Sequence, residues 1–284
     1  MRAWAFCRSL LITALVGGLA SATLVRMAPG FEEDERELDP RLSEASRQAI
    51  RDSRVADRNL LKFYPRYLGG LLRGEFGVSH SLHRPVAELL AERSPVTFRL
   101  AAWGLIAGWI LGLGLALAAS SKSLRLDLFS SSLCGLLFCL PAAVIGVLAL
   151  FAGAAPWWAI ALAVLPKVFT YARNLLEKVY AAPHVLVARA KGLSTGRILL
   201  WHVIPSMAPE MLALAGVTVS LAFSAAIPIE AVCDVPGLGQ LAWQAALGRD
   251  LPVLVTFTLL LAIVTRAGSA AADLATQAVR PEGS

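Results

Sequence analysis

One uncharged run, AAWGLIAGWILGLGLALAAS at Ala101–Ser120, leaves few folds open to this chain. It is as long as the roughly 20 residues that an α-helix needs to cross the hydrocarbon core of a bilayer. The composition agrees, since 57% of the residues are hydrophobic and 16% are charged, whereas about a quarter of the residues in a soluble domain are charged. The sequence therefore predicts an all-α polytopic membrane protein.

Further segments are also long and apolar enough to be spans, which predicts about six transmembrane helices. These segments are Ser9–Val25, Leu128–Ala152 with a bend or break at Pro141, Pro156–Tyr171, Met207–Ile227 and Leu251–Ala271. The helix that begins at Pro156 can continue to Tyr180. The first segment starts after basic residues and ends in small ones, so a cleavable signal peptide is the alternative interpretation there.

Three regions follow from this pattern. Residues 1–26 are expected to form the first transmembrane helix, 27–96 an extracytoplasmic helical region, and 97–284 a core of five transmembrane helices whose main loop is 183–205. From Met27 to Pro95 there are 12 acidic and 11 basic residues. This near balance does not indicate on which side of the membrane the region lies, and long segments cross the membrane largely regardless of charge.

Cations in the short loops predict the orientation. They gather in the loops after the second and fourth spans, at Lys122, Arg125, Arg173, Lys178, Arg189, Lys191 and Arg197. Short loops rich in lysine and arginine stay in the cytoplasm, so both termini are expected inside. The net charge of +6 is accordingly assigned to the cytoplasmic face and anionic lipid headgroups rather than to nucleic acid.

The largest of these loops contains VARAKGLSTGRILLWHVIPS, Val187–Ser206. Residues 184–191 are expected to form a short helix that ends at Gly192, which suits a left-handed backbone. Ser194 or Thr195 can then cap a second helix. Small and apolar side chains on the first helix suit docking of a partner, while its cations equally suit a helix lying on headgroups. The residues alone leave both interpretations open.

A longer stretch, HVLVARAKGLSTGRILLWHVIPSMAP, resembles the cytoplasmic signature loop of binding-protein-dependent ABC transporter permeases of the dipeptide/oligopeptide/nickel family. The matching positions are Ala188, Ala190, Lys191, Gly192, Leu193, His202 and Pro209. Two positions depart from the family pattern. His184 stands where an aromatic residue is expected, and Ser206 stands where asparagine is usual.

Three more segments resemble the same family and appear in the right order. They are GEFGVSHSLHRPVAELLAERSPVTFRLA from Gly74, IEAVCDVPGLGQL from Ile229 and GRDLPVL from Gly248. The segment FAGAAPWW is shorter than the family's outer loop, and the tail DLATQAVRPEGS lacks the usual Asp-Pro-Arg ending. These departures concern the substrate and the degree of activity rather than the architecture.

The resemblance implies a type I ABC importer permease in the bacterial inner membrane. Such a subunit forms half of a translocation path for peptides or a similar small solute. Its implied partners are two ATPase subunits, a second and distinct permease, an extracytoplasmic solute-binding protein and membrane lipid. The residues implied to couple it to an ATPase are Val185, Ala188, Arg189, Ala190, Lys191, Gly192 and Leu193.

No enzymatic activity, cofactor or metal is expected of the chain itself. A phosphate-binding GxxxxGK[ST] loop is absent from the sequence, so ATP hydrolysis would fall to the partner subunits. His184 and His202 are isolated, and the four cysteines form no CxxC pair.

Two further groups of residues suggest roles in transport. Lys167 lies about 15 Å into its span, where a cation commonly faces a pore or the interior of a bundle. Contact with an anionic solute group is one hypothesis, and an internal ion pair or snorkelling is the alternative. The loop with Glu230, Pro236, Gly237 and Gly239 is expected to face the binding protein, although Glu230 can equally brace the PGLG turn.

Two other classes of protein compete with a permease. A secondary transporter needs ion-coupling carboxylates at membrane depth, where this sequence places Lys167 alone. A non-transporting membrane scaffold is compatible with the atypical tail and the short outer loop.

Overall fold

The computed structural model describes residues 81–120 and 124–279, together with 69–70, 73–74, 76–79 and the single positions Arg8, Ile12, Val16 and Thr23. The expected first span, Ser9–Val25, lies outside the described residues apart from three positions. Most of region 27–96, the cation Lys122 and the tail from position 280 also lie outside them.

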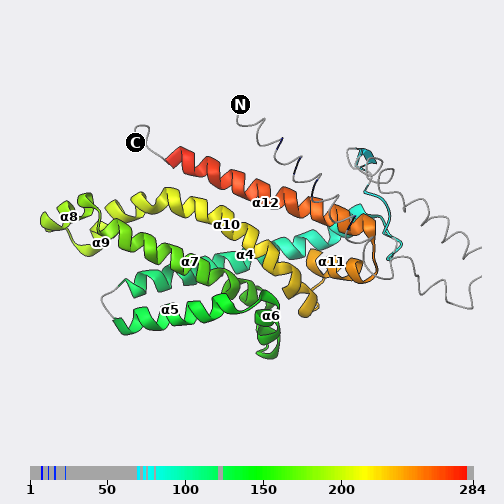
Figure 1. Cartoon of the computed structure of the whole chain (residues 1–284), viewed down its shortest axis with the longest axis horizontal. Coiled ribbons are helices and arrows are strands. Elements are labelled where there is room, and N and C mark those ends of the chain that lie inside the picture. Colours follow the sequence, from blue (N-terminus) through cyan, green and yellow to red (C-terminus); the bar gives the residue numbers. More distant parts are fainter. Residues whose placement is uncertain are drawn as a thin grey trace, which may run out of the picture. The chain divides into compact units, whose positions relative to one another are not determined.

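The described residues form helices joined by short loops (Figure 1), with one isolated bridge between Val78 and Pro85. The elements in chain order are α4 (Val86–Ala119), α5 (Leu124–Cys139), α6 (Ala142–Phe151), α7 (Pro156–Tyr180), α8 (Pro183–Ala190), α9 (Thr195–Ile198), the π-helix η1 (Leu199–Val203), α10 (Ile204–Val232), α11 (Leu238–Leu247) and α12 (Leu251–Val279).

Four of these helices are long and apolar enough to cross a membrane, and a bent pair makes a fifth candidate. The four are Val86–Ala119, Pro156–Tyr180, Thr195–Val232 and Leu251–Thr276. In the pair, α5 and α6 meet at 106°, and Pro141, which has no N–H to continue α5, precedes α6. The expected break at Pro141 and the expected continuation of the fourth span to Tyr180 are both confirmed.

The chain divides into two compact units. Unit 1 consists of Met1–Ser94 and Leu241–Ile263, and unit 2 of Pro95–Gln240 and Val264–Ser284. Residues far apart in the sequence share one small core in unit 1. Its buried members are Val86, Leu89, Leu241, Ala245 and Val253.

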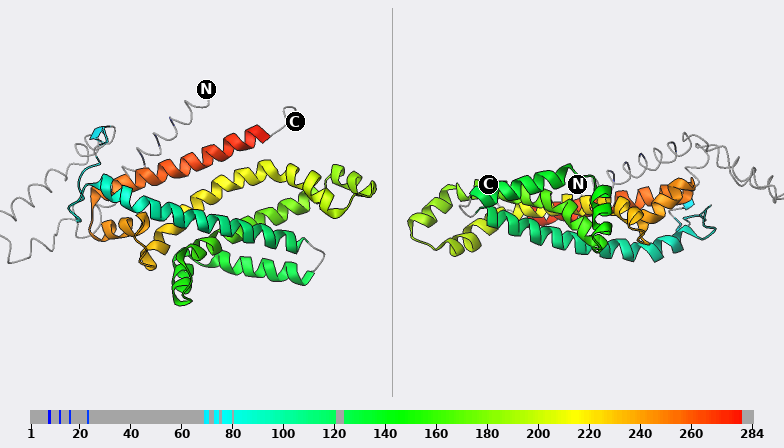
Figure 2. Two further views of the ribbon diagram at one scale, coloured as in Figure 1. Left: turned by 180° about the vertical axis from the view of Figure 1, so that it is seen from behind. Right: turned by 90° about the horizontal axis from the view of Figure 1, so that it is seen from below.

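Within unit 2, α7 is the most enclosed span, because it packs against α5, α6 and α10. It lies between α10 and α5 (Figure 2). Its buried side chains belong to two clusters, one centred on Ile160, Val164 and Val168 and the other on Phe169 and Leu176. α7 is thus the axis around which the neighbouring helices of unit 2 are arranged.

The contact between α4 and α7 depends on three glycines spaced one turn apart on α4. The facing pairs are Gly104 with Ile160, Gly108 with Val164 and Gly112 with Val168. A Cβ atom added to these glycines would lie 2.6, 3.1 and 2.8 Å from the Cβ atoms of their partners. Small residues let membrane helices approach closely enough for backbone and branched side chains to interlock. This row of glycines therefore sets the separation of the two helices.

Candidate functional site

The short helix α8 lies with α9 at the end of the antiparallel α7–α10 pair (Figure 1). Pro183 begins α8, where its missing N–H costs no helical hydrogen bond. Gly192 has φ +75°, and its N–H and that of Leu193 bond the carbonyls of Arg189 and Ala188 at 2.9 and 3.3 Å. This pair of bonds is a Schellman motif, which confirms the expected short helix and its end at Gly192.

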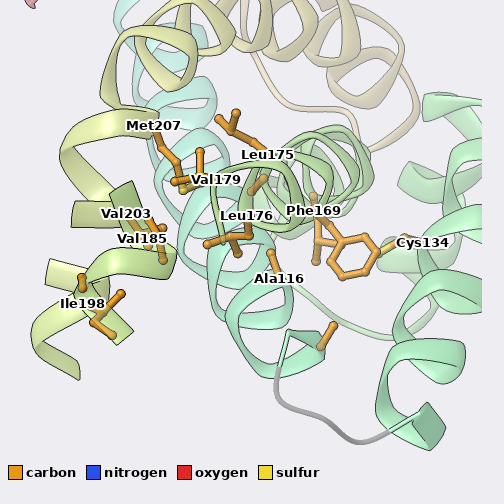
Figure 3. Packing of buried hydrophobic residues seen from close by; sticks show 14 residues of the cluster. Ala116, Cys134, Phe169, Leu175, Leu176, Val179, Val185, Ile198, Val203 and Met207 are labelled. Carbon is orange, nitrogen blue, oxygen red and sulfur yellow. The ribbon is translucent and has the colours of Figure 1, made fainter. Parts of the chain in front are cut away.

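One side of α8 packs into the core of unit 2. Val185 and Ala188 are 0% and 3% exposed, and they share a cluster with Leu176, Val179 and Val203 (Figure 3). The Ala188 side chain is small enough for α8 to lie directly against this cluster. Two residues expected at a coupling surface therefore hold the helix in place instead of facing outward.

The opposite side of α8 is apolar and exposed. It consists of Pro183, Leu186, Val187 and Ala190, which recur at helical spacing and which we call the outer face of α8. Leu186 and Val187 are 51% and 53% exposed. Arg189 and Lys191 are also exposed and flank this face, while Leu193 is half-buried. An exposed apolar strip with cationic borders is a surface suited to a protein partner.

Arg189 is held at the base of this surface. Its guanidinium lies 5.4 Å from the centre of the Tyr180 ring, at the end of α7. This distance is within the range of a cation–π contact. The contact fixes one cationic border of the outer face relative to α7.

The two positions that depart from the family pattern touch each other. His184 Nε2 lies 3.3 Å from Ser206 Oγ, and the Ser206 hydroxyl donates to the carbonyl of His202 at 2.7 Å. Because the hydroxyl has one proton, Ser206 Oγ accepts from His184 Nε2–H. The pair links α8 to the first turn of α10.

The second half of the loop differs from the single capped helix that the sequence predicts. Ser194 has an extended backbone, but its side chain makes no capping bond. After one turn of α9 the chain forms the π-helix η1, in which Leu200 and Trp201 are exposed. Pro205 has no N–H to bond the carbonyl of Trp201, and a π turn is one way for the preceding backbone to adjust.

Arg173 and Lys178, expected among the loop cations, lie in the last turns of α7. Arg173 donates to both carboxylate oxygens of Asp127 on α5, at 2.6 and 2.9 Å, and pairs with Glu177 at 3.0 Å. Lys178 pairs with Glu210 of α10 at 3.2 Å. These pairs join α5, α7 and α10 near the end that carries α8.

Glu230 lies in the last turn of α10, and its side chain reaches the turn that follows. It is completely buried, and its Oε2 accepts the N–H of Gly239 at 2.6 Å, while Thr97 Oγ1 accepts the N–H of Leu238 at 2.8 Å. These two N–H groups begin α11, so Glu230 and Thr97 cap that helix. A Cβ on Gly237 would overlap the Glu230 carboxylate, which explains glycine at this position.

This geometry corrects the expectation for the outer loop. Glu230, Gly237 and Gly239 are buried, whereas Pro236 is exposed. A buried carboxylate that caps a helix is not presented to a separate protein. In this turn Pro236 and Asp234 are the exposed positions.

In unit 1, two of the segments that carry the family resemblance meet at Asp250, the acidic residue of GRDLPVL. Asp250 is fully buried, and its Oδ2 accepts from Ser79 Oγ, Ser81 N and Ser81 Oγ at 2.5, 3.0 and 2.8 Å. The only local signal is an acid followed by Leu-Pro at the start of a span. Asp250 therefore ties the approach to α4 to the start of α12.

Lys167 lies midway along α7 with its side chain exposed. Among the residues that the structure describes, no carboxylate pairs with it, and no three His, Cys, Asp or Glu side chains are placed to hold a metal ion.

The family model of the binding-protein-dependent transport system inner membrane component matches residues 104–282, well over half of the chain. The chain belongs to this family. It is a permease subunit of an ABC importer, located in the inner membrane with several spans. This permease is not an enzyme, because ATP hydrolysis falls to partner ATPases, and the family also implies a binding-protein partner.

Curated relatives of this permease match it over most of its length. It is 26% identical to the dipeptide transport system permease protein DppB of Lactococcus lactis subsp. cremoris, over 86% of this chain and 87% of that protein. It is 24% identical to the oligopeptide transport system permease protein AppB of Bacillus subtilis, over 99% of each chain. It is 26% identical to OppB of Haemophilus influenzae, over 91% of each chain.

The fold of this permease is found in a solved transporter. A chain of the MetNI methionine ABC transporter, in an inward-facing conformation, superposes with a TM-score of 0.62 and 18% identity. The match covers 68% of this permease and 97% of that chain. At this identity the likeness concerns the fold alone.

Proposed function

We propose that this permease forms half of the path by which an ABC importer carries peptides or similar small solutes into the cell. The relatives that match most of its length are named for dipeptide and oligopeptide transport, which supports this solute class. In this proposal the chain has six spans with both termini in the cytoplasm, and its second permease is a different chain.

The outer face of α8 is the observation that carries the proposal. It is an exposed apolar strip on a helix whose other side is anchored in the core. We propose that each of two ATPase subunits receives one such helix in a groove, and that a solute-binding protein docks at the opposite side of the membrane. Movement of the ATPase is then passed through α8 to α7 and α10, because buried contacts fix α8 to both.

The orientation has support from charge. Lys178, Arg189, Lys191 and Arg197 surround the α8 end of the α7–α10 pair, whereas Asp234 and Asp250 lie in the loops after α10 and α11. Cations mark cytoplasmic loops. An α8 on the cytoplasmic side is where a cytoplasmic ATPase can reach it.

Co-purification tests this proposal. The tagged permease is expressed with its neighbouring subunits, and we expect an ATPase to remain bound in mild detergent. Val187→Asp should lower the recovered ATPase about tenfold or more, because a charge at the centre of an apolar interface commonly costs over 1.4 kcal/mol. Leu200→Asp is the matched control, since Leu200 is an apolar residue of the same loop outside α8 and is 61% exposed, compared with 53% for Val187.

Two results would contradict the docking role. One is a wild-type permease that never retains an ATPase, which favours a scaffold. The other is equal recovery with Val187→Asp and Leu200→Asp, which removes α8 from the interface.

A further inference from the structure

Most of α7 is enclosed by its neighbours, but one strip of it remains exposed. Between positions 159 and 176 of α7 the exposed residues are Lys167, Thr170, Tyr171 and Asn174, at spacings of three, one and three. Trp158, Glu177 and Lys178 are exposed nearer the two ends of the helix. The four middle positions share one face of a helix. All four side chains are polar, and we call them the polar strip of α7.

The exposed surfaces of the neighbouring spans have a different character. Between positions 101 and 119 of α4 and between 126 and 139 of α5 the large exposed side chains are apolar: Trp103, Ile106, Ile110, Leu117, Leu128, Phe129, Leu136 and Phe138. Such surfaces suit contact with lipid tails. Inserting a lysine at the bilayer centre is energetically unfavourable, so the polar strip is a poor surface for lipid.

The depth of Lys167 makes escape to a headgroup difficult. It is 11 residues from Pro156 and 13 from Tyr180, which is roughly 16 and 20 Å along the helix axis. A four-carbon stem covers less than half of either distance. No carboxylate among the described residues neutralises it.

The exposed side of α10 brings polar groups to the same depth. The Lys178–Glu210 pair sets the register of α7 against antiparallel α10. Val217 and Ser224 follow Glu210 at intervals of seven, on the same side of α10, and both are exposed. In this register Ser220 and Ser224 lie within a turn of the level of Lys167, which puts two hydroxyl groups of a second helix at the depth of the lysine.

We propose that the polar strip lines a water-filled part of the translocation path and that Lys167 binds the carboxylate of the passing solute there. This inference rests on the proposed function for the identity of the solute. An ammonium group offers three hydrogen-bond donors to a carboxylate, while Thr170, Asn174 and Ser224 offer neutral groups to the rest of the molecule. One cation among neutral polar groups selects anionic ends without holding them tightly.

Thiol labelling in the assembled transporter tests the strip without any solute. The four native cysteines are replaced by alanine, and Thr170→Cys, Asn174→Cys or Ile110→Cys is introduced singly. Membrane vesicles of both orientations are treated with an anionic or a cationic methanethiosulfonate reagent. We expect reaction at positions 170 and 174, and none at position 110 on the apolar face of α4.

The charge preference tests Lys167 itself. At Thr170→Cys the anionic reagent should react about tenfold faster than the cationic one, relative to their rates with a free thiol, because a cation lies one turn away. Adding Lys167→Met should abolish this preference, and Arg125→Met, which removes an exposed cation from α5, should leave it unchanged.

Each alternative gives its own result. Unreactive cysteines at positions 170 and 174 would overturn the water-filled path and indicate lipid or a partner subunit against the strip. Reaction without a charge preference would overturn the carboxylate site. If the labelling is as expected but wild-type vesicles take up no peptide, the proposed solute fails and the strip stands.

Discussion

At the scale of single residues, Gly192 is needed for its backbone conformation and not because a side chain would lack room. Nothing lies within 4 Å of a Cβ placed on it, yet its backbone has φ +75°. The requirement is therefore conformational, since a left-handed residue other than glycine costs roughly 1–2 kcal/mol and asparagine is the best tolerated substitute.

This distinction gives a prediction. Gly192→Val should misplace the end of α8 and lower ATPase co-purification several-fold, whereas Gly192→Asn should retain most of it. Equal recovery of ATPase with both variants would mean that the Schellman turn does not matter for docking.

Glu230 shows what the sequence could not reveal at this scale. Its place beside PGLG indicates either a brace or a binding surface, and only the fold brings Thr97 from α4 and the start of α11 around it. Burial depends on those distant partners. Neither the residue type nor the local sequence pattern identifies those partners.

At the scale of elements, the close packing of α4 against α7 at the row of glycines can be tested with a control from the same helix. Gly108→Leu places a side chain against Val164 and the Ala161 carbonyl, 3.1 and 3.0 Å from the new Cβ, whereas Gly114 faces open space. Overpacking of this kind costs about 1–3 kcal/mol. Gly108→Leu should lower the unfolding temperature of the purified permease in detergent, and Gly114→Leu should not.

A similar loss of stability in both variants would contradict the close packing. It would attribute the effect to leucine in α4 in general.

The elements themselves were largely predictable, because their signals are local. Pro141, Pro183 and Gly192 mark helix ends by their own backbone chemistry. The side of α8 that packs inward was not predictable. Val185 and Val187 are alike as residues, and Leu176, Val179 and Val203 decide which of them is buried.

At the scale of the whole molecule, the proposed orientation predicts which loops are reachable from outside. Position 155 is exposed before α7. In the cysteine-free background, Ala155→Cys should react with a membrane-impermeant thiol reagent in cells whose outer membrane is permeabilised and whose inner membrane is intact. Gly196→Cys, exposed in α9, should react only after the inner membrane is opened. The reverse pattern would invert the topology and remove α8 from the cytoplasm.

The bend between α5 and α6 has a consequence for how the subunit sits in the bilayer. If α5 stands across the membrane, a helix that leaves it at 106° runs nearly parallel to the surface. Along α6 the exposed side chains include Leu148, Leu150 and Phe151, and the stacked pair Trp157 and Trp158 follows. Aromatic side chains favour the interface between lipid and water. We therefore expect this rim to hold one side of the subunit at a fixed depth in the bilayer while α7 and α10 tilt.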